Sequence, residues 1–283
     1  MLKISYLGPA NTNTHLAALK RFKGGKFEHA PTVEDVFRAV ELEEVDYGVI
    51  PIENSLEGAV THTLDRFVQF KQTPARIVGE IEMPIRHCFI TLHKTPRDKV
   101  RIIYSHPQAF AQCQNWLNKY FPDATRRETR STAEAIEDIL LKDGIWNRYE
   151  RAAIGSPELA KQHKLKAISI PVDRDNRTRF LVISSTRRTK RGKRNRTSLM
   201  FALKDKPGAL HDALIPFKDC GINLTKIESR PTKQRAWEYV FFVDIEGHET
   251  DKPVKRALRT LERNASRLLI LGSYPIGGSR GRG

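Results

Sequence analysis

The segment Asn176-Arg-Thr-Arg-Phe-Leu-Val-Ile183 joins a polar loop directly to an apolar strand. The loop places the hydroxyl of Thr178 beside the guanidinium of Arg179, and it contains no nucleophile, strong base or metal ligand. Polar groups adjoin an apolar strand in the same way in three earlier segments, residues 7–14, 50–55 and 104–107. Because open α/β sheets bind their ligands at the carboxyl ends of strands, four such segments predict an α/β fold with a ligand site.

Amphipathic helices alternate with short apolar runs over residues 1–185, which is the pattern of α/β folds. One helix is expected to begin after Thr32, and its apolar residues share one face: Val33, Val36, Phe37 and Val40. A similar helix is expected after Ser131, which has Glu134 three residues further on, as in a capping box. Two matching units indicate two similar lobes, and a small-molecule site is then expected between them.

Residues 198–275 follow a compact β-α-β-β-α-β pattern. A strand over residues 198–204 precedes a helix that is expected to begin at Pro207, with Gly221 just past its end. Pro216 inside that helix lacks a backbone donor, so a kink or a break is expected there. The Gly- and Arg-rich residues 276–283 are expected to form a disordered tail.

The length and composition suit a globular protein of about two domains. The chain has 283 residues, 39% of them hydrophobic, and no run of about 18 apolar residues that could span a membrane. The first residues already resemble a strand, so no signal segment is expected. The three cysteines, Cys88, Cys113 and Cys220, form no Cys-x-x-Cys motif and indicate reduced thiols. These features predict a cytoplasmic protein.

Seven basic residues lie in one acid-free stretch and supply much of the net charge of +16. They are Arg187, Arg188, Lys190, Arg191, Lys193, Arg194 and Arg196. Such a cluster could attract nucleic acid or anionic lipid. It lacks helical periodicity and interleaved aromatic residues, so we interpret residues 186–197 as a solvated basic linker. Neither nucleic acid nor a membrane is expected as a partner.

The polar segments, taken in order, resemble the prephenate dehydratase family of phenylalanine biosynthesis. The motifs that carry this resemblance are Pro51-Ile-Glu-Asn-Ser55, Tyr104-Ser-His-Pro-Gln-Ala-Phe-Ala-Gln-Cys113 and Thr178-Arg-Phe180. Asp205-Lys-Pro-Gly-Ala-Leu210 and Glu228-Ser-Arg-Pro231 resemble an ACT domain, so the resemblance covers nearly the whole chain. One loop departs from the family pattern Gly-Pro-x-Gly-Thr-Phe-Ser, because Asn11 replaces the second Gly and Asn13 replaces the Phe.

The resemblance implies a fold class and a set of domain boundaries. The implied fold is α/β: a two-lobed catalytic region like the periplasmic binding proteins, with a central cleft, and a ferredoxin-like βαββαβ ACT domain. The catalytic domain is expected over residues 1–185, the linker over 186–197, the ACT domain over 198–275 and the tail over 276–283.

The resemblance also implies roles for active-site residues. Thr178 is expected to donate to the departing hydroxyl, and the other expected catalytic residues are Asn54, Ser105 and Gln112. The expected substrate-binding residues are Thr12, Ser55, Arg179 and Phe180. Asn54 and Ser55 are expected just before a helix, whose N-terminus would favour an anion. Arg179 could grip a substrate carboxylate or form a salt bridge to an acid such as Glu53, and both alternatives stay open.

No metal and no cofactor is expected. Four histidines, His15, His62, His87 and His106, show neither a zinc-binding spacing nor a recognisable nucleophile as partner. They are interpreted as structural residues.

The resemblance to an ACT domain implies feedback inhibition by L-phenylalanine. It places the effector where two such modules meet, so a homodimer or homotetramer is expected. The implied contacts are Gly208, Ala209, Leu210, Asn223, Leu224, Glu228, Ser229 and Arg230. A chain that ends near Ser185 is expected to keep some activity and lose the inhibition, provided that the catalytic part is stable alone.

The leading function is prephenate dehydratase, which converts prephenate into phenylpyruvate, CO₂ and water. Arogenate dehydratase, which performs the same elimination on the aminated substrate, stays open. Two alternatives come from other classes of protein. One is a non-catalytic small-molecule-binding regulator, and the other is a nucleic-acid-binding regulator that depends only on the basic stretch.

Overall fold

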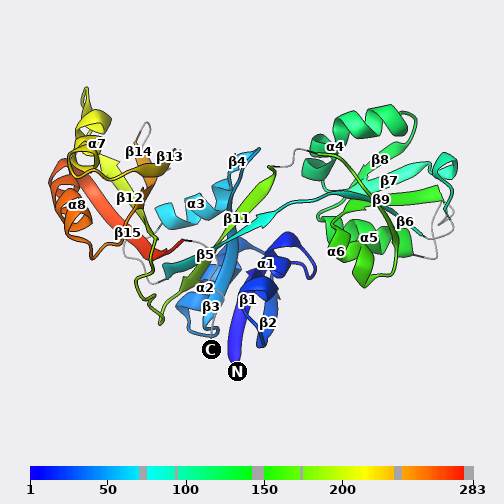
Figure 1. Cartoon of the computed structure of the whole chain (residues 1–283), viewed down its shortest axis with the longest axis horizontal. Coiled ribbons are helices and arrows are strands. Elements are labelled where there is room, and N and C mark those ends of the chain that lie inside the picture. Colours follow the sequence, from blue (N-terminus) through cyan, green and yellow to red (C-terminus); the bar gives the residue numbers. More distant parts are fainter. Residues whose placement is uncertain (70–74, 93–94, 142–149, 173–174, 233–237, 277–283) are drawn as a thin grey trace. The chain divides into compact units, whose positions relative to one another are not determined.

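A computed structural model describes residues 1–69, 75–92, 95–141, 150–172, 175–232 and 238–276 (Figure 1). The chain forms two compact units. Unit 1 consists of Met1–Leu7, Ala17–Glu82 and Arg179–Gly283, and unit 2 consists of Gly8–Leu16 and Met83–Thr178. Apart from Ile276, the tail expected at 276–283 lies outside the described residues.

The N-terminal part of unit 1 is built on a mixed sheet with the strand order β2-β1-β3-β11-β5, and β4 pairs with β3. Strand β1 is parallel to both β2 and β3, whereas β4 is antiparallel to β3. The strands are β1 (Leu2–Leu7), β2 (Gly25–Ala30), β3 (Tyr47–Asn54), β4 (Gly58–Ala59), β5 (Arg76–Pro84) and β11 (Arg177–Ser184).

Three helices follow the first strands of this sheet: α1 (Asn13–Arg21), α2 (Val33–Glu41) and α3 (Thr61–Val68). Helix α2 begins as the sequence predicts, because the Thr32 side chain accepts a hydrogen bond from the backbone N–H of Asp35 at 3.1 Å. The four apolar residues of its predicted face are all buried. They pack with α3 and with residues of β3, β5 and β11 in one core.

Unit 2 contains a second mixed sheet with the order β10-β6-β9-β7-β8. Strands β7, β8 and β9 pair in parallel, whereas β6 is antiparallel to both β9 and β10. The strands are β6 (Cys88–Thr91), β7 (Ile102–Ser105), β8 (Thr125–Glu128), β9 (Arg151–Gly155) and β10 (Lys166–Ser169), with a short 3₁₀ turn η1 (Arg97–Lys99) before β7.

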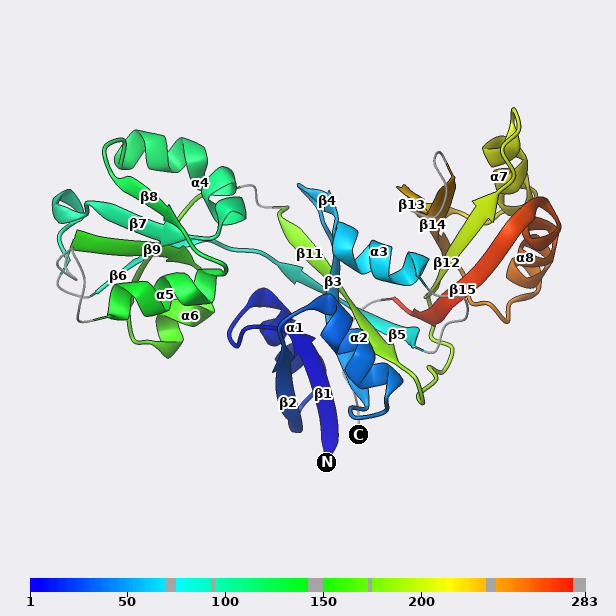
Figure 2. The same ribbon diagram turned by 180° about the vertical axis from the view of Figure 1, so that it is seen from behind.

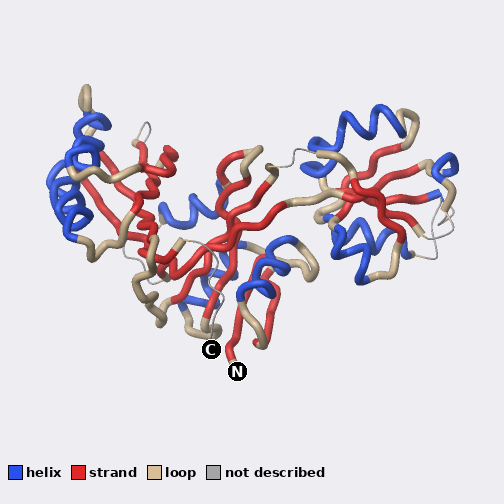
Figure 3. Tube along the Cα trace, in the orientation of Figure 1, coloured by secondary structure: helices blue, strands red, loops and turns tan. Residues whose placement is uncertain are grey.

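Helices cover both faces of the second sheet (Figure 3). Because strand side chains alternate in direction, Ile102 and Tyr104 of β7 pack in the core that holds α5 (Thr132–Leu140) and α6 (Pro157–Gln162). Ile103 between them packs in the core that holds α4 (Pro107–Tyr120). The predicted cap at Ser131 is present, since its side chain accepts from Glu134 N–H at 3.0 Å. The expected pair of α/β lobes is therefore confirmed.

The C-terminal module has the predicted βαββαβ order and an antiparallel sheet, β13-β14-β12-β15. Its helices α7 and α8 lie on one face of the sheet (Figure 2, the view opposite to that of Figure 1). The elements are β12 (Asn195–Leu203), α7 (Ala209–Asp219), β13 (Leu224–Pro231), β14 (Tyr239–Glu246), α8 (Lys252–Asn264) and β15 (Ala265–Pro275). Helix α7 runs through Pro216 as one helix, so of the kink or break expected there, the break is wrong and the kink stays a prediction.

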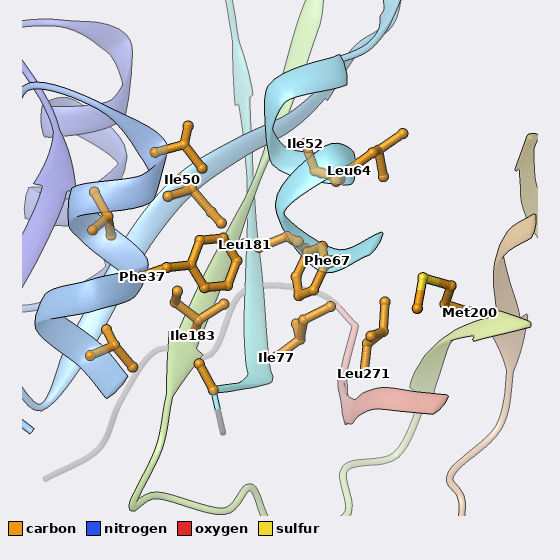
Figure 4. Packing of buried hydrophobic residues seen from close by; sticks show 14 of the residues in the cluster. Phe37, Ile50, Ile52, Leu64, Phe67, Ile77, Leu181, Ile183, Met200 and Leu271 are labelled. Carbon is orange, nitrogen blue, oxygen red and sulfur yellow. The ribbon is translucent and has the colours of Figure 1, made fainter. Parts of the chain in front are cut away.

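The two faces of this C-terminal sheet have different partners. Leu199 and Phe201 of β12 pack with α7 and α8. Met200, which lies between them in the strand, packs in the core of the N-terminal sheet, together with Phe242 of β14 and Leu271 of β15. Figure 4 shows Met200 and Leu271 in the same cluster as Phe67 and Ile77. The C-terminal module therefore completes the core of the N-terminal part of unit 1.

Gly272 of β15 lies against the backbone of β5. A Cβ atom placed on Gly272 would collide with the carbonyl oxygen of Ile77. Only a residue without a side chain therefore allows this close approach.

The basic stretch is mostly exposed, as expected for a solvated linker, but it also contacts the rest of the protein. Arg187 pairs with Asp46 at 3.0 Å, and Arg191 pairs with Asp251 at 2.9 Å. Thr189 donates to the carbonyl oxygen of Ser273 at 2.7 Å, and strand β12 already begins at Asn195. These contacts attach the stretch to the protein surface, while the side chains of Arg187 and Arg191 stay 52% and 65% exposed.

Candidate active site

Unit 2 holds four of the eight residues predicted for catalysis or substrate binding: Thr12, Ser105, Gln112 and Thr178. Thr178 is half-buried at the start of β11, one residue before the chain passes into unit 1. Ser105 is the last residue of β7 and is fully buried, and its hydroxyl donates to the carbonyl oxygen of Ile154 in β9 at 3.0 Å. The hydroxyl oxygen of Ser105 keeps its capacity to accept a hydrogen bond.

Gln112, on helix α4, has its side-chain oxygen fixed by two neighbours. His87 Nε2 lies 2.6 Å from Gln112 Oε1, and the Asn176 side-chain amide donates to the same oxygen at 2.8 Å. His87 and Asn176 are both buried, at 6% and 1% exposure. These two contacts fix the orientation of the Gln112 side chain.

His87 and Asn176 were not among the predicted site residues. His87 was interpreted as structural, and its contact with Gln112 bridges 25 positions of sequence. Asn176 stands two residues before Thr178, and this spacing is a signal that could have drawn attention to it. His106, by contrast, serves as the cap of α4, since its Nδ1 accepts from Gln108 N–H at 3.3 Å.

The loop that carries Thr12 forms a turn with Asn11 at the position where the family pattern has its second glycine. Asn11 has a φ of 66°, in the left-handed region that glycine and asparagine tolerate best. Its N–H donates to His15 Nδ1 at 2.9 Å, and burial lowers the pKa of His15, which favours the neutral ring that can accept. Thr12 donates its hydroxyl to the carbonyl oxygen of Pro9 at 3.0 Å.

Unit 1 holds the other four residues, Asn54, Ser55, Arg179 and Phe180. Asn54 ends β3, and its side-chain oxygen accepts from Leu56 N–H at 2.9 Å and Glu57 N–H at 3.2 Å. Helix α3 begins only at Thr61, after the turn and the short strand β4. The expectation that Asn54 and Ser55 directly precede a helix is therefore wrong, because a β-hairpin turn intervenes and Asn54 caps that turn.

Arg179 forms the salt bridge that the sequence left open. Its Nε donates to Glu53 Oε1 at 2.6 Å, and its side chain is only 9% exposed. Burial opposes the charged form of Arg179, but nearby Asp244 and Glu53 outweigh it and raise the pKa. Phe180 is 1% exposed and packs in the core. A direct substrate contact by either residue stays a prediction.

Among the described residues, no group of three or more His, Cys, Asp and Glu could hold a metal ion. All three cysteines are free thiols. Burial raises the pKa of Cys113 to about 12, so this thiol stays protonated at neutral pH. The described helices also include none with the length and apolar character needed to cross a membrane.

The C-terminal module contains a cavity of about 720 Å³ at the start of α7. Gly208, Ala209 and Leu210 line it, together with Tyr239 and Phe241 of β14. The remaining residues predicted to bind phenylalanine lie on or next to the edge strand β13: Asn223, Leu224, Glu228, Ser229 and Arg230. Arg230 pairs with Asp65 of α3 at 2.7 Å. Within one chain, the structure thus groups three of the eight residues around the cavity.

Comparison with known proteins agrees with this architecture of two α/β lobes and a βαββαβ module. The family model described as "Prephenate dehydratase" matches residues 4–188, and the model described as "ACT domain" matches residues 197–263. The chain therefore belongs to the prephenate dehydratase family, as a dehydratase domain followed by an ACT domain.

Individual relatives support the same assignment. A bifunctional chorismate mutase/prephenate dehydratase of Aquifex aeolicus is 45% identical, over 97% of this chain and 74% of the relative. A prephenate dehydratase of Bacillus subtilis is 34% identical, over 96% of this chain and 98% of the relative. The crystal structure of a prephenate dehydratase from Arthrobacter aurescens in complex with L-Phe superposes with a TM-score of 0.87 at 32% identity, covering 97% of this chain and 90% of that one. The chain is thus a prephenate dehydratase, a hydro-lyase of phenylalanine biosynthesis.

Proposed function

We propose that Thr178 supplies the proton for the departing hydroxyl in the dehydration of prephenate. In this reaction the bond between the ring and its carboxylate breaks, and its electron pair enters the ring as CO₂ leaves. The ring C–O bond breaks at the same time, and the hydroxide takes a proton and leaves as water. Aromatisation supplies the drive, so a hydroxyl donor suffices and no strong base is needed.

The other polar residues hold the substrate in this proposal. Asn54, Ser55 and Thr12 offer uncharged polar groups, and Gln112 offers a side-chain amide that His87 and Asn176 orient. Ser105 holds the end of β7 against β9 and accepts from the substrate. The observation that carries the proposal is the Thr178-Arg-Phe180 motif within the matched dehydratase region.

The proposed contacts favour prephenate over arogenate. Arogenate carries an ammonium group that needs a carboxylate or several acceptors. None of the proposed polar contacts is acidic, and Glu53 beside Asn54 already pairs with Arg179 and Lys226.

We expect the purified protein to form phenylpyruvate from prephenate with a kcat/KM at least about tenfold above that for arogenate, a difference of roughly 1.4 kcal/mol in transition-state binding. Initial rates on both substrates test this expectation. Faster conversion of arogenate to phenylalanine would overturn it.

We further propose that L-phenylalanine inhibits the enzyme by binding in the cavity of the ACT domain. The N-terminus of α7 favours a carboxylate there, and Leu210, Tyr239 and Phe241 offer apolar surface for a ring. A second copy of the chain would bring the residues of its β13 edge to the site, in a homodimer or homotetramer.

The three free thiols support a cytoplasmic location.

Two matched glycine variants test the effector site. Gly208 and Gly221 both have positive φ, 77° and 64°, and open space where a Cβ atom would lie, but only Gly208 lines the cavity. Gly208→Asp should raise the Kd of L-phenylalanine at least about tenfold, because the new carboxylate repels that of the ligand. Gly221→Asp should leave it within about threefold. Calorimetry on the full-length protein measures both, and equal Kd values would contradict the proposed site.

A further inference from the structure

Arg179 lies at the centre of a buried ion-pair network. Besides its bond to Glu53, its Nη2 donates to Asp244 Oδ2 at 2.6 Å and its Nη1 to Glu80 Oε2 at 3.3 Å. The guanidinium thus uses all three of its nitrogens on three carboxylates. The side chains of Arg179, Glu80 and Asp244 are only 8–9% exposed, so water screens these contacts little.

Two further cations balance the charge of the network. Lys226 contacts Glu53, and Arg196 contacts Glu80. Three cations therefore face three carboxylates, and no charge in the group is left in excess. A buried group of this kind adds little stability compared with apolar residues of the same size, but it demands one specific geometry.

The network joins the ACT domain to the strands of the dehydratase domain. Glu53, Glu80 and Arg179 come from β3, β5 and β11, whereas Asp244 comes from β14 of the ACT sheet. Asp244 is itself fixed, because its other oxygen accepts from Ser198 at 2.6 Å. Ser198 also lies 2.8 Å from the hydroxyl of the buried Tyr274.

Two residues of the network are sequence neighbours of residues proposed for catalysis. Arg179 directly follows Thr178 in β11, and Glu53 directly precedes Asn54 in β3. Neighbouring residues of a strand share a backbone, so contacts that hold the Arg179 side chain also restrain the backbone from which the Thr178 side chain projects. Reaction rates are sensitive to misplacement of such groups by about 1 Å.

We propose that Asp244 of the ACT domain is a positioning residue for the dehydratase reaction, acting through Arg179 on Thr178 and through Glu53 on Asn54. This inference rests on the proposed roles of Thr178 and Asn54. Through Asp244, the ACT domain would help to position β11, the strand that carries Thr178. An effector that binds the ACT domain would then shift an equilibrium between two arrangements of the network. The shift would move the carboxylate of Asp244 and so change the rate of the reaction.

Asp244→Asn tests the proposal, because it keeps the size of the side chain and removes its charge. We expect kcat for prephenate to fall about tenfold or more, with KM within about threefold, as for an interaction expressed in the transition state. Inhibition by L-phenylalanine should also weaken. Glu249→Gln is the matched control: Glu249 pairs with Arg76 at 2.9 Å, also joins the ACT domain to the dehydratase domain, and lies outside the network. It should leave both quantities unchanged.

Ser198→Ala gives a milder second variant, which loses the hydrogen bond that orients Asp244 and keeps the charge. We expect it to lower kcat in the same direction but by less. Wild-type kcat in folded Asp244→Asn or, should that variant not fold, in Ser198→Ala would overturn the proposal. An equal loss of kcat in Glu249→Gln would also overturn the proposal, because it would show that any change at the interface between the two domains lowers kcat. Thr178→Ala separates this result from failure of the catalytic assignment, since normal turnover in that variant would remove Thr178 itself from the mechanism.

Discussion

Thr178→Ala should lower kcat for prephenate by roughly 10²- to 10⁴-fold, the usual contribution of a positioned proton donor. KM should change by no more than about threefold, because the hydroxyl contributes mainly when the C–O bond breaks. Thr178 is half-buried at the start of β11, so losing its hydroxyl leaves the core intact. Steady-state kinetics with prephenate measure both constants.

Two further substitutions at this position distinguish the effect of the hydroxyl from the effect of the side-chain shape. Thr178→Ser keeps the donor and should retain most of the activity, whereas Thr178→Val keeps the branched shape and should resemble Thr178→Ala. Circular dichroism should show the same fold for all three. Near-normal turnover in Thr178→Val would rule out proton donation by this residue.

A chain that ends at Ser185 should fail to fold stably, which differs from the expectation drawn from the sequence. Met200, Phe242 and Leu271 of the ACT domain pack in the core of the N-terminal sheet. Removing one large core side chain costs about 2–5 kcal/mol, and leaving a buried charge unpaired costs about 3–5 kcal/mol. The shortened chain loses several apolar contacts and leaves Arg179 without Asp244 and Glu80 without Arg196. These losses are comparable to the whole stability of a typical domain.

Thermal unfolding and size-exclusion chromatography test this expectation. A chain that ends at Ile276 is the control, because it keeps every core residue among the described positions. It should unfold cooperatively at the temperature of the full-length protein. Cooperative unfolding and dehydratase activity in the chain ending at Ser185 would show that the shared core is dispensable.

Local signals in the sequence predicted much of the fold. The cap at Thr32 and the apolar face after it describe α2 as the structure has it. The break expected at Pro216 is wrong, because α7 is held by packing: Pro216 and Phe217 are buried, and tertiary contacts offset the missing hydrogen bond. Local rules state the cost of a proline in a helix, but they do not include the contacts made by distant strands.

The site was predictable only in part, for the same reason. The motifs predict roles for Thr178, Asn54 and Gln112, each of which stands in a short recognisable segment, and these roles stay predictions. The partners of these segments are distant in sequence: Asp244 lies 65 positions from Arg179, and His87 lies 25 positions from Gln112. A salt bridge to Glu53 could be suggested from the sequence, but the choice of Asp244 and Glu80 depends on how two sheets pack.

The close approach of Gly272 to Ile77 restricts how ACT domains can be exchanged between enzymes of this family. A grafted domain must carry glycine at this position of its last strand, since any side chain there would act as a wedge against β5. A transplant that matches the effector cavity but ignores this position would separate the two domains by the thickness of a methyl group. The recipient would keep the residues proposed for catalysis but lose the packing between the two sheets on which the proposed coupling depends.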